Sequence, residues 1–151
     1  MFTTVRYFIK TSIVFLIIGI LSGLFMSFSR YVFKSGYYPE IITAHTHIIL
    51  AGSVLMMIMG VALWFFPKAE KEDKKYNPLL IYITYWAMTF TTLIRFVLQI
   101  MKGFYFYDWI GIGITIASTF QILAIGLFFY SIWGRIRPVR IQYVKSKGEV
   151  K

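Results

Sequence analysis

The sequence has 151 residues, of which 58% are hydrophobic and 15% are charged, and its formal net charge is +10. Its mean hydropathy is +0.69. A soluble domain is typically about 45–50% apolar and about 25% charged, so this composition excludes an ordinary water-soluble fold. Cysteine is absent, which excludes disulfides, thiolate metal sites and covalent attachment of c-type haem.

Four long apolar stretches occupy most of the chain, at residues 7–33, 41–66, 78–101 and 109–133. Each is long enough to cross a hydrocarbon core of about 30 Å as a helix. Residues 13–18 are continuously apolar and lack the alternation of a barrel strand. Because backbone groups in lipid must bond within their own segment, we predict four transmembrane helices. The first stretch is too long for the apolar core of a signal peptide and is expected to remain.

The predicted fold is therefore an all-α, polytopic membrane protein with one domain at residues 1–137 and a basic tail at 138–151. Twelve of the sixteen lysines and arginines lie before or in the first turn of the first span, between the second and third, or after the fourth. This positive-inside pattern predicts that both termini face the cytoplasm. The tail suits anionic lipid headgroups, and we expect no nucleic-acid partner. The predicted location is the inner membrane of a prokaryotic cell.

Small residues are spaced four apart on two of the predicted helices. The first carries Gly19 and Gly23, and the fourth carries Gly111, Thr115 and Thr119. This spacing lets helix backbones approach closely in lipid. It predicts a compact bundle or a dimer but indicates no activity.

Four polar side chains stand out within the predicted spans: His45, His47, Arg95 and Gln121. At 1.5 Å per residue, the two histidines lie about 8–11 Å inside one surface, and Arg95 lies about 10 Å below the same surface. An imidazole and a guanidinium at one level suit a haem whose iron binds histidine and whose acid groups pair with arginine. As alternatives to haem binding, the histidines form interhelical hydrogen bonds, and the Arg95 side chain extends to the membrane surface. Gln121 is deeper and is expected to form an interhelical hydrogen bond.

One face of the second predicted helix suggests further haem contacts. Helical spacing aligns His45 with Gly52, Met56 and Gly60. The two glycines would leave room for a flat macrocycle, and Met56 is an adaptable apolar contact. Alternatively, the glycines only bring two helices together.

The segment Thr43-Ala44-His45-x-x-Ile48-Ile49, with the methionine-rich run that follows, resembles the second transmembrane helix of the large subunit of haem–copper oxidases. Nitric oxide reductases belong to the same superfamily. The resemblance implies that His45 is an axial ligand of a low-spin haem, with Arg95 as a candidate partner of the propionates. Those subunits use further histidines for a second haem and a catalytic metal. This sequence contains only His45 and His47, so it does not provide an oxidase-type copper site.

The two histidines lie about 200° apart around a helix and cannot bind one iron from the same chain. Two copies of the chain could share haem across a homodimer interface. The iron would then be bound by His45 of both copies, or by His45 of one copy and His47 of the other. Alternatively, His45 pairs with Met88, or the iron keeps an open position. We favour the shared site because a low-spin haem requires two ligands.

The leading functional prediction is a b-type membrane cytochrome, an electron-transfer protein rather than a complete enzyme, with quinone or a respiratory complex as its partner. A second hypothesis is a haem carrier, haem chaperone or gas sensor with an open iron position. A third is a non-haem accessory or assembly subunit of a respiratory complex.

Overall fold

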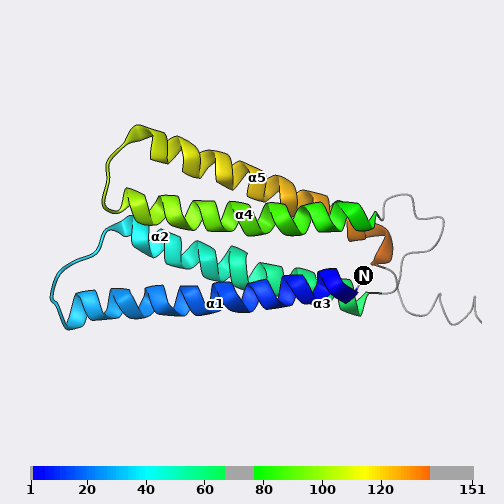
Figure 1. Cartoon of the computed structure of the whole chain (residues 1–151), viewed down its shortest axis with the longest axis horizontal. Coiled ribbons are helices and arrows are strands. Elements are labelled where there is room, and N and C mark those ends of the chain that lie inside the picture. The colour runs from blue at the N-terminus through cyan, green and yellow to red at the C-terminus, as the bar shows by residue number, and fades with distance from the viewer. Residues whose placement is uncertain (1, 67–76, 137–151) are drawn as a thin grey trace, which may run out of the picture.

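The computed structural model describes residues 2–66 and 77–136. Four long helical rods run side by side along the longest axis of the molecule (Figure 1). The first rod is α1 (Phe2–Tyr31). The second is continuous but contains three segments, namely α2 (Pro39–His47), the π-helix η1 (Ile48–Leu55) and α3 (Met56–Phe65). The third is α4 (Pro78–Lys102), and the fourth is α5 (Asp108–Ile132), which ends in the 3-10 turn η2 (Trp133–Arg135).

All four rods are long and apolar enough to cross a membrane, with 25 to 29 residues each. This result confirms the all-α class and the four predicted spans. The largest boundary difference is at the N-terminus, where α1 begins at Phe2 rather than at residue 7. The extra turn contains the exposed Arg6, which a helix end outside the hydrocarbon region tolerates. The tail predicted at 138–151 lies outside the described residues, and nothing in the fold tests which side the termini face.

The helices begin at residues whose chemistry suits a helix start. Pro39 and Pro78 occupy first-turn positions, where a missing backbone N–H costs nothing. The Asn77 side chain accepts a hydrogen bond from the backbone N–H of Leu79 at 2.9 Å and so caps α4.

The rods pack in chain order, with α1 against η1 and α3, α2 against α4, and α4 against α5. At the end that carries the N-terminus, Phe8 of α1 meets Phe128 of α5 edge-on, with 6.1 Å between ring centroids. Toward the opposite end, α5 separates from α1 (Figure 1). The main apolar core accordingly lies in the half of the bundle nearest the N-terminus, and it includes Phe8, Met56, Met88 and Phe128.

A buried arginine joins the ends of two rods in that half. Arg135 is only 2% exposed, and its Nη2 donates to the backbone oxygens of Leu63 at 2.9 Å and Phe66 at 2.8 Å. These carbonyls are among the last of the second rod and have no partner within their own helix. Arg135 therefore caps the C-terminal end of α3 from the end of α5.

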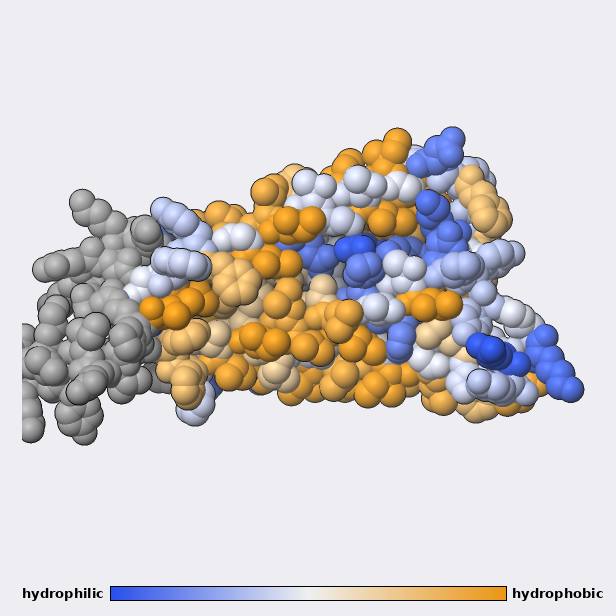
Figure 2. Space-filling model, turned by 180° about the vertical axis from the view of Figure 1, so that it is seen from behind, coloured by the Kyte–Doolittle hydropathy of each residue, from blue (hydrophilic) through white to orange (hydrophobic). Residues whose placement is uncertain are grey.

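The outer surface is mostly apolar, as a bilayer requires. Figure 2 shows a broad hydrophobic band across the middle of one face of the molecule, interrupted by a patch of hydrophilic surface. Large exposed side chains such as Ile20, Leu24 and Ile122 form part of the lipid-facing surface.

Replacing Arg135 with methionine should lower the free energy of unfolding by about 2–3 kcal/mol, because the variant loses charged hydrogen bonds to two helix-end carbonyls. Denaturation in mixed micelles, followed by circular dichroism, measures the change. The control is Arg30→Met, since Arg30 is an exposed arginine near the end of α1. Equal stability of the two variants would show that the Arg135 cap contributes little.

Candidate functional site

Both histidines lie at the end of α2, directly before the eight-residue π-helix η1. A π-helix closes its hydrogen bonds over five residues instead of four, and such segments are rare and are frequently found at functional sites. The two side chains are partly exposed and face different helices. They therefore form two separate sites.

His45 faces α1. Its Nδ1 lies 2.9 Å from the backbone oxygen of Gly19 and 3.1 Å from Oγ of Ser22. Because a carbonyl oxygen only accepts, Nδ1 carries the proton and donates, and the neutral ring then has an unprotonated Nε2. Among the described residues, none forms a hydrogen bond with that Nε2.

The close approach of α1 makes this contact possible. A Cβ at Gly23 would lie 2.9 Å from Cε1 of His45, and one at Gly19 would overlap Ile49. A side chain at Gly23 would crowd the imidazole and one at Gly19 would crowd Ile49, so both glycines let α1 lie close to the second rod. The packing predicted from Gly19 and Gly23 is thus confirmed.

His47 faces α4, where Nη2 of Arg95 donates to its Nε2 at 2.6 Å. A guanidinium has no acceptor, so His47 carries its proton on Nδ1. Nη1 of Arg95 donates to Oε1 of Gln121 at 3.2 Å, and Nε2 of Gln121 donates to Oγ1 of Thr92 at 2.8 Å. Three rods are therefore joined by one chain of hydrogen bonds.

This network settles several sequence predictions. His47 and Arg95 share one level, as their depths indicated, and Gln121 forms the predicted interhelical hydrogen bond. Arg95 does not extend toward the membrane–water interface, because its guanidinium bonds to His47 and Gln121 within the bundle. Its side chain leans toward the N-terminus of α4, as helical side chains do, and so meets the deeper Gln121.

Two polar atoms near this network are buried without a hydrogen-bond partner among the described residues. They are Nε of Arg95 and Oε1 of Gln99, one a donor and the other an acceptor. Both residues lie on α4, one helical turn apart. Gln99 could not be singled out from the sequence, because a single glutamine near a helix end resembles an ordinary interfacial residue.

Gly52 and Met56 lie inside the bundle. A Cβ at Gly52 would lie 2.8 Å from Cγ2 of Thr92 and 2.9 Å from Cδ2 of Phe15. Met56 is completely buried in the apolar core. The room predicted beside Gly52 is thus filled by side chains of α1 and α4, which supports the alternative reading that this glycine brings helices together. Contact of Gly52, Met56 or Arg95 with a cofactor stays a prediction.

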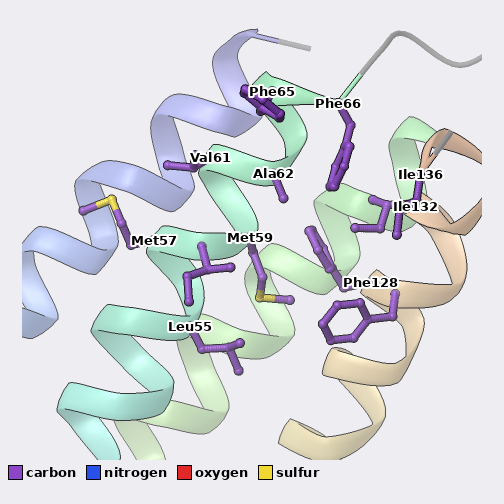
Figure 3. Close-up of a pocket in the computed structure, with 12 residues that line it drawn as sticks. Leu55, Met57, Met59, Val61, Ala62, Phe65, Phe66, Phe128, Ile132 and Ile136 are labelled. Carbon is purple, nitrogen blue, oxygen red and sulfur yellow. The ribbon is translucent and has the colours of Figure 1, made fainter. Parts of the chain in front are cut away.

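An apolar groove of about 470 Å³ lies between α3 and the second half of α5. Figure 3 shows Met59, Phe128 and Ile132 facing one another across it, with Phe66 near one end. This groove could not be predicted from the sequence, because its walls are about seventy residues apart in the chain. In the described part of the chain, no group of three His, Cys, Asp or Glu side chains could hold a metal ion.

Comparison with known proteins identifies one relationship. The model of the family "Cytochrome C and Quinol oxidase polypeptide I" matches residues 3–145. No curated protein and no solved structure matches the chain significantly.

Substituting alanine at Gly52 should lower the free energy of unfolding by about 1–3 kcal/mol, because the added methyl group overpacks a three-helix contact. The matched control is Gly126→Ala, since a Cβ there meets nothing within 4 Å. Thermal unfolding of both variants in detergent measures the difference. If Gly52→Ala is as stable as Gly126→Ala, the close packing at Gly52 is wrong.

Proposed function

The chain belongs to the cytochrome c and quinol oxidase polypeptide I family, and on this premise we propose that it is a membrane haem protein that transfers single electrons. Members of this family bind haem. The observation that supports the proposal most directly is the arrangement of His45, the residue that the oxidase resemblance assigns to the iron.

The hydrogen bonds of His45 suit an iron ligand. Metal-binding histidines commonly donate the other ring N–H to a backbone carbonyl, which fixes the tautomer and the orientation of the ring. Nδ1 of His45 donates to Gly19 in this way, and Nε2 keeps its lone pair. We therefore propose His45 Nε2 as an axial ligand. A haem held there would supply one-electron chemistry at its iron, and it would be held non-covalently because cysteine is absent. Its proposed type is haem b.

The second ligand is proposed to come from another copy of the chain. Nε2 of His47 accepts a hydrogen bond from Arg95, and Met88 is completely buried in the core. This leaves one available imidazole per chain, so a low-spin iron would be held by two copies of His45 across a homodimer interface. Iron with two imidazole ligands has no vacancy for substrate, which suits electron transfer.

The electron partner is proposed to be a quinol or another component of a respiratory complex, since the family description includes quinol oxidases. The four apolar rods make the chain a multi-pass membrane protein. The inner membrane of a prokaryote, with both termini in the cytoplasm, remains the proposed location because of the distribution of basic residues.

A second candidate function is a haem carrier, haem chaperone or gas sensor with an open iron position. The same observation supports it, because one chain by itself offers a single unoccupied imidazole nitrogen. A non-haem accessory subunit remains the third candidate, and it would use the histidines only as hydrogen-bonding groups.

The purified protein should show paired low-spin absorption bands when reduced, with one haem for every two chains. His45→Gln should abolish the bands, because it removes the ligand. His47→Gln is the matched control and should retain them, since the amide oxygen still accepts a hydrogen bond from Arg95. Optical spectra with haem quantification test both variants. Bands that persist in His45→Gln would exclude the proposed ligand.

Carbon monoxide distinguishes the first two candidate functions. Six-coordinate iron should bind little of the gas, because both axial positions are occupied by imidazole. The measurement is the spectrum of the reduced protein before and after addition of carbon monoxide. Rapid and complete binding would contradict the shared site and favour the open-position protein.

A further inference from the structure

A second groove, of about 290 Å³, lies between α1 and α4 in the half of the bundle that carries the N-terminus. Val14 and Ile18 line it on α1, and Thr89 and Leu93 line it on α4. Lys10 is the charged residue in its lining. This α1–α4 groove is therefore mostly apolar and has a basic side chain at one end.

The α1–α4 groove occupies one leaflet of the membrane. Ile18 and Thr89 lie next to the middles of their spans, and Leu93 is one turn farther along α4. From Lys10 to Ile18 is eight residues, or about 12 Å along the helix axis. Half of the hydrocarbon core is about 15 Å deep. The groove thus runs from Lys10 to the middle of the bilayer on the side of the N-terminus.

A row of side chains on α1 leads from the membrane surface into this groove. Four residues spaced four apart share one face of the helix: Arg6, Lys10, Val14 and Ile18. Arg6 lies about 16 Å from the middle of its span, and Lys10 lies about 10 Å from it. Both are exposed, and a lysine so placed extends its ammonium group outward along its apolar stem. The two positive charges therefore lie at the level of the lipid headgroups.

No carboxylate among the described residues lies near these two cations. The acidic residues of the described helices, Glu40 and Asp108, are in the first turns of α2 and α5, at the opposite end of the rods (Figure 1). Basic side chains at this level attract anionic headgroups. An anion from the membrane surface is thus suited to Arg6 and Lys10.

The hydroxyl groups at the groove already have partners within the bundle. Oγ1 of Thr11 and the hydroxyl of Tyr85 lie 2.8 Å apart and form a hydrogen bond. Oγ1 of Thr89 donates to the backbone oxygen of Tyr85 at 2.9 Å. Because these groups are paired, a hydrocarbon chain covers them at little cost in free energy. The groove therefore suits an acyl chain better than a polar molecule.

We propose that the α1–α4 groove binds an anionic phospholipid, with its phosphate at Arg6 and Lys10 and one acyl chain along Val14 and Ile18. The two cations and the groove lie in one leaflet, so the headgroup and the chain belong to the same molecule. The distribution of basic residues predicts that this is the cytoplasmic leaflet. The proposal does not depend on haem, since His45 lies in the other half of the bundle.

Native mass spectrometry of the full chain in detergent tests the headgroup position, with added phosphatidylglycerol or phosphatidylcholine of the same acyl chains. Wild-type protein should retain one phosphatidylglycerol in preference to phosphatidylcholine, whose choline group the two cations repel. The double variant Arg6→Gln, Lys10→Gln should weaken this retention at least about tenfold, because two attractions to the phosphate are lost. The matched control is Arg30→Gln, Lys34→Gln, which removes two exposed cations near the other end of α1 and should leave retention unchanged.

A further variant tests the groove while both cations stay in place. Val14→Trp fills the groove and should also weaken retention of phosphatidylglycerol. Ile17→Trp is its control, since Ile17 is equally exposed on α1 but does not line the groove. Circular dichroism checks that all variants are folded.

Equal retention of the two lipids by wild-type protein, or unchanged retention in the double variant, would overturn the headgroup position. Unchanged retention in Val14→Trp, or an equal loss in Ile17→Trp, would overturn the acyl-chain position. A wild-type dimer that retains no lipid, and that Val14→Trp dissociates, would assign the groove to a second copy of the chain instead.

Discussion

The hydrogen bond from Arg95 to His47 organises the polar half of the bundle. In lipid, a polar side chain without water must find a partner on a neighbouring helix. This bond occupies Nε2 of His47 and fixes its tautomer, while Gln121 extends the connection to α5. As a consequence, the two histidines, only two residues apart, have different hydrogen-bond partners. His45 keeps a free ring nitrogen, whereas His47 supports a charge.

The two halves of the bundle are held together by different interactions, apolar packing in one and interhelical hydrogen bonds in the other. Near the N-terminus, apolar side chains such as Phe8 and Phe128 interlock, and Arg135 closes the end of α3. In the other half, glycines on α1 allow a close approach, α4 is joined to the second rod by the hydrogen bond from Arg95 to His47, and α5 is joined to α4 through Gln121. The haem proposal depends on the first of these contacts, because Gly19 orients His45. In the second, no carboxylate among the described residues pairs with Arg95.

Hydropathy and the rise per residue of a helix predicted the positions of the spans and the depth of each residue in the membrane. The four spans, the shared level of His47 and Arg95, and the interhelical role of Gln121 follow from these two quantities. The position around each helix axis could not be predicted in the same way, because it depends on which helices become neighbours. Gly52 therefore proved to contact Phe15 and Thr92. The π-helix at Ile48–Leu55 has no signature in an apolar run, and the groove joins distant segments.

The central claim is that the two histidines have different hydrogen-bond partners. Solid-state NMR of the protein in bilayers, with ¹⁵N in the histidine rings and arginine side chains, tests it directly, and a His47→Gln variant assigns the signals. We predict that His47 is protonated at Nδ1 and that its Nε2 correlates with a guanidinium nitrogen of Arg95. A correlation of Arg95 with His45, or of Arg95 with neither ring, would contradict the account.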